Sequence, residues 1–233
     1  MELPYFYIPD LSLQNITLDE ATSRHIIQVL RMEKKDELNL TNGKGERCTV
    51  SITDDHRKHC SVTVLDRLLV PLTAPKVCIA ISLLKNASRF EWFLEKATEV
   101  GVREIIPLIC ERTNKNKIRT DRFQNIMISA LVQSQQSWLP VLQQPLPFAE
   151  ALKMDYDEKL IAHCLPTNRK RITHAIKDKI IFIGPEGDFT EKEIALAIDT
   201  NCEAVTLGHT RLRTETAGIV AAALLTVNEF DRL

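Results

Sequence analysis

Two short loops hold the residues of this sequence that could do chemistry. The first, GPEG at residues 184–187, follows an apolar run and leads into a helical pattern, and the second, RLRTETAG at residues 211–218, opens the last helical pattern. Glycines let backbone groups approach a ligand closely, and a carboxylate such as Glu186 in a low-dielectric pocket favours a neutral or cationic ligand. Arg211 and Arg213 gain nothing from the positive end of a helix, so we expect them to face an anion.

Phosphate-binding loops do not account for these residues. No Gly-x-Gly-x-x-Gly pattern follows the run 76–84, and no Gly-x-x-x-x-Gly-Lys-[Ser/Thr] pattern occurs in the chain. Glu186 would also repel a triphosphate. The sulfonium of S-adenosyl-L-methionine is a cation that such a turn would favour, whereas the purely structural alternative for Gly-Pro-Glu-Gly is a plain β-turn with Pro at its second position.

The part of the chain after residue 75 alternates strand-like and helical patterns. The strand-like apolar runs lie at residues 76–84, 104–110, 159–164, 179–184 and 203–208, and the helical patterns at 88–101, 121–135, 190–200 and 214–230. Continuous apolar strands separated by helices predict an α/β domain with a parallel sheet covered on both faces. Ligands bind beyond the carboxyl ends of such strands, so we expect the segments after several of these runs to meet at one edge.

The first 70 residues are mostly β. Short alternating runs at residues 5–8, 36–40, 47–53 and 60–69 predict strands, and Asn42-Gly43 predicts a hairpin turn. One helix is expected over residues 22–31, with Ile26, Ile27, Val29 and Leu30 toward the core. A small barrel is the natural way to close such strands. The predicted domains are therefore residues 1–70 and 76–233, with a linker at 71–75.

The composition is that of an ordinary globular protein. The 233 residues include 44% hydrophobic and 26% charged residues, and the formal net charge is −1. A general nucleic-acid binder would be more basic, so any RNA contact must be local. No apolar stretch reaches the ~18 residues needed to span a bilayer. The six cysteines form no Cys-x-x-Cys pair, and the first ten residues lack a signal-peptide pattern, so we expect a cytoplasmic protein without a membrane anchor.

Basic residues gather in two places that could contact RNA. The segment 111–122 has five basic residues against two acidic ones, and a second group lies in the N-terminal part. The alternative for any such charge run is a solvated surface. The candidate RNA contacts are Arg24, Arg31, Arg89, Arg112, Asn114, Lys115, Lys117 and Arg119. We predict no metal site, because the His and Cys residues of DDHRKHC, at residues 54–60, lack a second group of ligands.

Several of these segments together resemble the RsmE family. IGPEGDFT, LRTETA, LLKNASRFEWFLEKATEVGV and PLICERTN occur in the family's order and spacing, and HIIQVLRMEKKDEL is similar to its N-terminal domain. Members of the family methylate N3 of one uridine in 16S ribosomal RNA with S-adenosyl-L-methionine. The resemblance implies a SPOUT-type, trefoil-knotted parallel-sheet domain, preceded by a small PUA-like β-barrel that binds RNA. It also implies a homodimer and the small ribosomal subunit as partner.

The resemblance, together with the loops, assigns roles to individual residues. Arg213 is expected to stabilise the uridine anion through O2 or O4, and Glu215 to orient Arg213 or accept the proton; a structural bridge between Arg213 and Glu215 is the alternative. The expected cofactor contacts are Leu83, Leu84, Lys85, His163, Ile183, Gly184, Pro185, Glu186, Gly187, Leu207, Gly208, Leu212, Thr214 and Ala217.

Two further functions fit the same sequence. One is a SPOUT enzyme that methylates the ribose 2′-oxygen, and the other is a non-catalytic RNA-binding or ribosome-assembly protein that has kept the fold. The sequence departs from the family pattern at His209-Thr210 and at Gln135-Gln136. Two intact ligand loops argue against the non-catalytic alternative, since a binding module has no use for a cofactor site.

Overall fold

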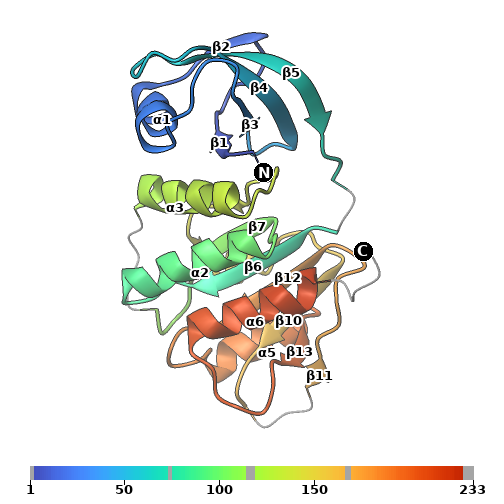
Figure 1. Ribbon diagram of the computed structural model, residues 1–233. Coiled ribbons are helices and arrows are strands. Elements are labelled where there is room, and N and C mark those ends of the chain that lie inside the picture. The colour runs from blue at the N-terminus through green and yellow to red at the C-terminus, as the bar shows by residue number, and fades with distance from the viewer. Residues whose placement is uncertain (1–2, 73–74, 114–118, 166–168, 228–233) are drawn as a thin grey trace. The chain divides into compact units, whose positions relative to one another are not determined.

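The computed structural model of the protein describes residues 3–72, 75–113, 119–165 and 169–227 (Figure 1). It forms two compact units, Met1–Thr73 with Leu131–Leu139 and Ala74–Ala130 with Pro140–Leu233. The sequence predicts one boundary, at residues 71–75, whereas the structure also assigns residues 131–139 to the first unit. Within the described ranges, no helix has both the length and the apolar character that a membrane span requires.

The first unit is built on a five-stranded sheet. Its strands run in the order β1-β3-β4-β5-β2, and every pairing except the parallel pair β1–β3 is antiparallel. Alternate residues of the strands, such as Leu38 and Leu40 or Val62 and Val64, are buried in one core, as the alternating pattern predicts. The strands are β1 (Tyr5–Tyr7), β2 (Asn15–Thr17), β3 (Glu37–Thr41), β4 (Glu46–Asp54) and β5 (Ser61–Leu69).

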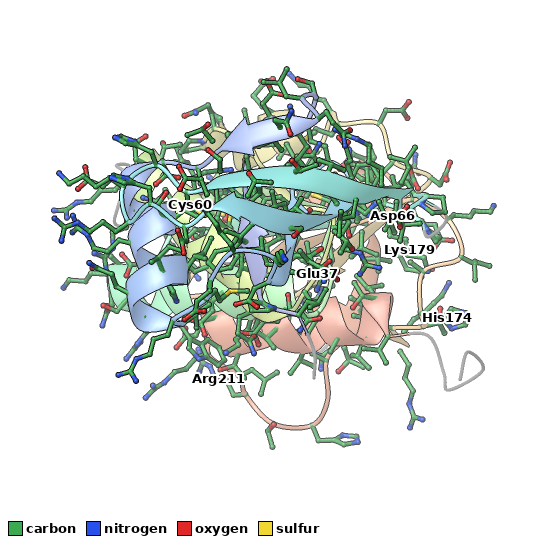
Figure 2. All side chains as sticks on the ribbon, turned by 45° about the horizontal axis from the view of Figure 1, so that its top comes forward. Glu37, Cys60, Asp66, His174, Lys179 and Arg211 are labelled. Carbon is green, nitrogen blue, oxygen red and sulfur yellow. The ribbon has the colours of Figure 1, made fainter. Side chains whose placement is uncertain are left out.

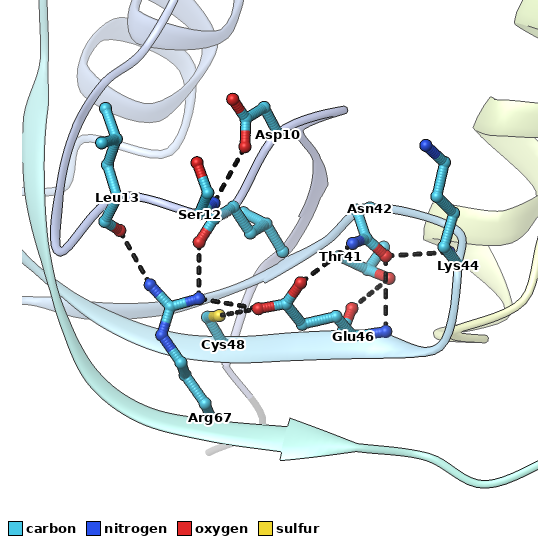
Figure 3. A network of polar contacts seen from close by, with 10 residues as sticks. Asp10, Ser12, Leu13, Thr41, Asn42, Lys44, Glu46, Cys48 and Arg67 are labelled. Carbon is cyan, nitrogen blue, oxygen red and sulfur yellow. Dashed lines mark hydrogen bonds and ion pairs between the residues drawn. The ribbon is translucent and has the colours of Figure 1, made fainter.

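A polar network holds the hairpin between β3 and β4 (Figure 3). The Asn42 side chain accepts hydrogen bonds from the backbone N–H groups of Lys44 and Glu46, and Gly43 has a φ of 68°, a conformation that glycine adopts without strain. Arg67 of β5 donates to the Glu46 carboxylate at 2.7 Å and to the carbonyl oxygens of Leu11 and Leu13. The predicted Asn-Gly hairpin is therefore confirmed.

The helix of the first unit changes its winding halfway. One α-helical turn, α1 (Glu20–Arg24), continues into the π-helix η1 (His25–Val29), in which the Leu30 N–H donates to the His25 carbonyl five residues earlier. Ile26 is fully buried, as predicted, but Val29 and Leu30 are 66% and 42% exposed. The prediction that Val29 and Leu30 face the core is wrong, because the wider π turn rotates them away from the position that a 3.6-residue period gives.

The segment after α3 (Thr120–Gln133) packs on the strands of the first unit. The Trp138 ring lies directly over Gly45, where an added Cβ would come within 2.2 Å of a ring atom, and its Nε1 donates to the Val70 carbonyl. The backbone joins as well, with the Gly45 N–H donating to Ser137 and the Leu139 N–H to Gly43. This explains why residues 131–139 belong to the first unit.

The second unit is an α/β layer structure, as the sequence predicts. Its sheet has the order β11-β13-β10-β12-β6-β7-β8, with β9 also on β7, and every pairing is parallel. Central strands such as β6 are buried at every position, which accounts for their continuous apolar sequences. The strands are β6 (Val77–Ser82), β7 (Glu104–Ile109), β8 (Val141–Leu142), β9 (Leu146–Pro147), β10 (Glu158–Ala162), β11 (Lys170–Arg171), β12 (Lys179–Ile183) and β13 (Glu203–Thr206).

Helices cover both faces of this sheet. On one face, α4 (Phe148–Ala151) and α5 (Glu191–Asp199) close a core that includes Cys78, Ala80 and Phe182. On the other face, α2 (Ala87–Glu99) and α6 (Thr214–Thr226) lie side by side, and α6 packs on β6 (Figure 1). The contact is close at Gly218, where an added Cβ would lie 2.7 Å from the Phe93 ring and 2.8 Å from Ile81.

The order of the strands brings distant loops together. The chain leaves β12, forms α5, and adds β13 on the far side of β10. It then returns, since α6 packs against β6 and β12. Residues 207–213 must therefore cross the carboxyl ends of β10 and β12, where the turn at residues 184–187 also lies.

Candidate functional site

One pocket at the carboxyl edge of the sheet collects the predicted ligand loops. Its volume is about 350 Å³, which is in the size range of small-molecule sites. The residues around it follow three neighbouring strands, β10, β12 and β13, and continue into the first turn of α6. The lining residues are Ala162, His163, Cys164, Arg169, Ile183, Gly184, Pro185, Glu186, Asp188, Val205, Thr206, Leu207, Gly208, Thr210, Arg211, Leu212, Arg213, Thr214 and Ala217.

Most of the residues expected to contact a cofactor lie on this pocket. They are His163, Ile183, Gly184, Pro185, Glu186, Leu207, Gly208, Leu212, Thr214 and Ala217, and Arg213 joins them. Five expected site residues do not line it: Leu83, Leu84, Lys85, Gly187 and Glu215. The side chains of Leu83 and Leu84 are buried in the core and that of Lys85 is exposed. Their strand, β6, lies between β12 and β7, away from the β10 and β13 side where the pocket opens.

The turn after β12 begins at Gly184, where Phe189 leaves no room for a side chain. An added Cβ on Gly184 would lie 3.0 Å from the Phe189 ring and 3.1 Å from the Phe189 backbone nitrogen. The Asp188 N–H closes the turn onto the Pro185 carbonyl, and Asp188 itself has a φ of 63°, which Asp adopts more readily than most residues. The sequence predicts the turn but not the role of Asp188, whose carboxylate accepts from the Cys164 N–H at 2.8 Å.

Residues after β7 fix the far side of the same turn. The Arg112 guanidinium donates to the Gly187 carbonyl at 2.6 Å. The helix α5 that follows the turn begins with the predicted capping box of Thr190 and Glu193, and the Glu193 carboxylate also accepts from the Glu111 N–H at 2.8 Å. The turn is therefore held from both sides before any ligand arrives.

His163, directly after β10, lines the pocket and is almost fully buried there. The residue is only 5% exposed, and its Nδ1 has no hydrogen-bond partner among the described residues. Burial lowers the pKa of His163, the Asp188 carboxylate opposes this and the Arg169 guanidinium adds to it, so the neutral imidazole is favoured. A buried polar atom without a partner costs stability, so a ligand that hydrogen-bonds to it would recover that energy.

The segment after β13 brings the arginines to the pocket. Gly208 has a φ of 135°, which only glycine adopts readily, and the chain then passes through Arg211 and Arg213 before α6 begins. Both arginine side chains line the pocket and are exposed; Figure 2 shows Arg211 on the loop that leads into α6. Among the described residues, neither arginine forms a hydrogen bond or ion pair with Glu215, so the alternative of a structural bridge between Arg213 and Glu215 is not seen there.

Glu215 has a different partner from the one expected. Its Oε1 lies 3.7 Å from Nε of Arg89 in α2, and the same guanidinium lies 3.5 Å from the Glu186 carboxylate. The Glu215 residue is 6% exposed, and its Oε2 has no hydrogen-bond partner among the described residues. Arg89, expected as an RNA contact, thus lies between two carboxylates.

The other expected RNA contacts differ in their surroundings. Arg24 is exposed and paired with Glu20 at 2.6 Å, and Arg31 and Arg119 are exposed. Arg112 is engaged with the turn, as described above. Asn114, Lys115 and Lys117 lie outside the described residues. Sequence reasoning did not single out Cys164, Arg169 and Thr210, which also line the pocket; their only signal is their place after strands that end at this edge.

Comparison with known proteins agrees with the geometry. A model described as an RNA methyltransferase domain matches residues 72–226, and one described as an RNA methyltransferase PUA domain matches residues 18–65. The ribosomal RNA small subunit methyltransferase E of Synechocystis is 32% identical over 221 residues, covering 89% of this chain and 71% of that protein. The enzyme of the same name from Rickettsia conorii is 28% identical and covers 96% and 95%.

Solved structures extend the likeness to the fold. A protein from Porphyromonas gingivalis described as a probable rRNA-methyltransferase has a TM-score of 0.89 and 36% identity over 94% of this chain and 95% of that one. The ribosomal RNA small subunit methyltransferase E of Neisseria gonorrhoeae, bound to S-adenosyl methionine, has a TM-score of 0.81 and 31% identity over 95% and 96%. Because the match covers both units and most of the sequence, this chain belongs to the RsmE family of RNA methyltransferases.

Proposed function

We propose that this protein transfers the methyl group of S-adenosyl-L-methionine to N3 of a uridine in the 16S RNA of the small ribosomal subunit. The observation that carries the proposal is the convergence of the turn 184–187 and the arginine segment 207–213 on one pocket. Three relatives named as small-subunit rRNA methyltransferases, from Synechocystis, Rickettsia conorii and Neisseria gonorrhoeae, support the reaction and the RNA class. The substrate is consistent with action in the cytoplasm, where small subunits are assembled.

The pocket suits the proposed cofactor. Its volume of about 350 Å³, the close backbone at Gly184 and the unpartnered His163 Nδ1 form a cradle for a molecule with polar edges. A solved relative from Legionella pneumophila, 30% identical with a TM-score of 0.83, is in complex with this cofactor. We assign the backbone of residues 184–187 and 207–212, together with His163, to holding the adenosine part. The Glu186 carboxylate favours the positive charge of the sulfonium.

When bound, the cofactor would supply a methyl carbon that a nitrogen attacks as the carbon–sulfur bond breaks and the neutral thioether leaves. The chain's own residues must hold the acceptor at about 3 Å from that carbon, and such alignment can contribute most of the acceleration. The proton on uridine N3 must also leave. Arg213 stabilises negative charge on O2 or O4, and Glu215, in the first turn of α6, accepts the proton.

Arg213→Ala tests this assignment. The rate of methyl transfer to small-subunit RNA should fall by about 10²–10³-fold, as when one donor to a developing anion is removed, with little change in cofactor affinity measured by calorimetry. Arg171→Ala, an exposed arginine on β11 that does not line the pocket, is the matched control. A parental rate in Arg213→Ala would rule out this role for Arg213.

The position of the methyl group has its own test. Methylation at N3 blocks the pairing edge of uracil, so primer extension on small-subunit RNA should stop at one site, and the stop should vanish in a strain without this gene. Digestion of the product to nucleosides and removal of the ribose separates a methylated base from a methylated 2′-oxygen. A methyl group lost with the ribose would exclude base methylation.

Local positive charge supports contact with RNA phosphates. In the PUA-type unit Arg24 and Arg31 are exposed, and in the second unit so is Arg119. We propose these three as phosphate contacts, and we extend the proposal to Asn114, Lys115 and Lys117. Binding should then weaken steeply with salt, and each arginine replaced by alanine should reduce the slope of log K against log[salt] by about one. A flat salt response would contradict these contacts.

Two features of the proposed enzyme go beyond the observed layers. The return of the chain across the ends of β10 and β12 supports a trefoil knot, which we propose for residues of the second unit.

The exposed Trp92 on α2 and Leu224 on α6, 43% and 42% exposed, support a homodimer through these helices. Light scattering of the purified protein should give twice the chain mass, and a monomer at micromolar concentration would contradict the dimer.

A further inference from the structure

Arg89 occupies an unusual position between two acidic side chains. Its guanidinium lies 3.5 Å from Glu186, on the cofactor turn, and 3.7 Å from Glu215, at the start of α6. The three residues come from separate segments of the second unit that are far apart in the sequence. Arg89 is about one-third exposed, Glu186 somewhat more, and Glu215 almost fully buried. A single cation therefore joins the two loops that form the pocket.

The packing of α2 against α6 explains why these residues meet. One turn beyond Arg89 on α2 lies Phe93, and one turn beyond Glu215 on α6 lies Gly218. An added Cβ on Gly218 would come within 2.7 Å of the Phe93 ring, so this ring packs directly on α6 at Gly218. Residues three or four apart share one face of a helix. The close contact at Gly218 thus sets the register that places Glu215 beside Arg89.

Glu215 is left with one oxygen to offer. Its Oε1 faces Arg89, while its Oε2 is buried and has no partner among the described residues. Leaving a buried carboxylate oxygen without a donor is costly, although the positive end of α6 compensates in part. Of the two carboxylate oxygens, Oε2 is therefore the one left to take up a proton.

We propose that Arg89 is a positioning residue, which holds the Glu215 carboxylate for proton acceptance and ties it to the cofactor turn through Glu186. Arg89 acts through these carboxylates and not as a phosphate contact. The inference rests on the proposed function, since Glu215 is the proton acceptor there. Arg has the planar fork needed to serve two carboxylates at once, whereas Lys offers a single point charge.

The experiment compares Arg89→Gln, Arg89→Lys and Glu215→Gln with the parental chain. Single-turnover methyl transfer is measured at saturating RNA and cofactor, and cofactor affinity is measured separately by calorimetry. Arg89→Gln should slow the single turnover by about 10–100-fold, because a misplaced reacting group costs up to about 10²-fold, and should change cofactor affinity only a few-fold. Arg89→Lys should recover part of the rate. Lys96→Gln, on the same helix but paired with Glu95 and Glu99, is the matched control and should keep the parental rate.

A double-mutant cycle identifies the partner. If Arg89 acts through Glu215, the chain with both Arg89→Gln and Glu215→Gln should be no slower than Glu215→Gln alone, since residues that act as a unit are not additive. Additive losses would overturn the inference. RNA affinity over a salt series provides the other arm: a salt slope reduced by about one in Arg89→Gln, with a parental rate at saturating RNA, would make Arg89 a phosphate contact and overturn the inference.

Different results would overturn the role of Arg89 and the proposed function of the protein. A parental rate in an Arg89→Gln chain that binds cofactor, next to an active parental enzyme, overturns the role of Arg89 alone. No methyl transfer by the parental chain on small-subunit RNA overturns the proposed function and this inference together. Thermal unfolding of each variant checks that the fold is kept, and Arg89→Lys carries the same test if Arg89→Gln does not fold.

Discussion

The two ends of the parallel sheet differ in whether their buried polar groups have hydrogen-bond or ion-pair partners. At the amino end, Glu104 is 2% exposed and is fully engaged, with Lys76 at 2.5 Å and with hydrogen bonds from Tyr156 and Gln143. Lys179, which begins β12 at the same end of the sheet, is 4% exposed and pairs with Glu158 at 2.8 Å. At the carboxyl end, His163 Nδ1 and Glu215 Oε2 are buried without a partner among the described residues.

This difference separates structure from function. Buried charges that pair with one another need no ligand, and removing one of them leaves its partner uncompensated. Buried polar atoms without partners are rare, so each requires an explanation. In this protein they occur at the edge where the ligand loops converge, which suggests that bound molecules supply the missing partners.

The largest effect is expected at the amino end. Glu104→Ala removes the centre of the satisfied group and leaves the buried Tyr156 hydroxyl without its acceptor, so the free energy of unfolding should fall by about 3 kcal/mol. Urea unfolding measures this. The control, Glu150→Ala, breaks an exposed pair with Lys153 and should change stability by less than about 1 kcal/mol. Equal losses in the two variants would remove the distinction between the edges.

A smaller loss is expected where α6 meets α2. Alanine is favoured over glycine inside a helix by about 1 kcal/mol, but the added methyl group of Gly218→Ala would lie 2.7 Å from Phe93 and 2.8 Å from Ile81. Forcing a methyl group into a packed core typically costs 1–3 kcal/mol, so we expect a net loss of up to about 2 kcal/mol in urea unfolding. A gain in stability would show that the helices can separate easily.

A substitution at the carboxyl edge should change the affinity for the ligand and leave the stability of the fold nearly unchanged. His163→Leu removes the unpartnered nitrogen, so the free energy of unfolding without ligand should stay within about 0.5 kcal/mol of the parental value or rise. Affinity for S-adenosyl-L-methionine, measured by calorimetry, should fall about tenfold, which corresponds to about 1.4 kcal/mol. His174→Leu replaces an exposed histidine (Figure 2) and should leave affinity unchanged. Parental affinity in His163→Leu would exclude a ligand contact there.

The buried groups at the two edges should also differ in the pH range over which they change the free energy of unfolding. Burial lowers the pKa of His163, so as the pH falls below the ordinary value of 6.5 the unfolded chain takes up a proton that the folded chain does not, and stability falls. For Glu104, burial raises the pKa, but hydrogen bonds from Lys76, Tyr156 and Gln143 outweigh it and lower the pKa. Its contribution is therefore present above pH 4.5 and is lost as the pH falls through its folded pKa.

Unfolding free energies from pH 8 to pH 3 test this order. His163→Leu should flatten the curve mainly below pH 6.5, and Glu104→Gln should flatten it mainly below pH 4.5. The effect of the histidine is the smallest of those predicted here. A His163→Leu curve that runs parallel to the parental one would mean that this imidazole titrates as it does in the unfolded chain.

The sequence predicts much of the second unit because its signals are local. A strand such as β6, buried at every position, must be continuously apolar, and the loops after parallel strands must meet at one edge. These two rules place the turn 184–187 and the segment 207–213 together before any coordinates are known. The predictions fail where the helix is irregular, as at Val29, the last residue of the π-helix, and at Leu30, which follows it.

The contacts between distant segments could not be predicted in this way. Arg89 and Glu215 meet only because α6 packs against α2 at Gly218, and no local pattern around Arg89 distinguishes this position from an RNA contact. Similarly, Leu83 and Leu84 follow a strand end but turn into the core, because their strand lies on the side of β12 away from the pocket. Which side of a strand the pocket opens on depends on strand order, which the periodicity of the sequence does not contain.

The packing of the Trp138 indole on Gly45 restricts how this protein can be divided into fragments. A fragment ending near residue 73 would lack the ring that covers the hairpin and the Ser137 carbonyl that accepts from the Gly45 N–H. It would also lack the N–H groups of Trp138 and Leu139, which donate to the Val70 and Gly43 carbonyls. Exchanging the RNA-binding module between relatives therefore requires two separate stretches of gene, or a rearranged chain in which residues 131–139 are joined to the end of the first. Recombination within this family is expected to preserve both stretches as a pair.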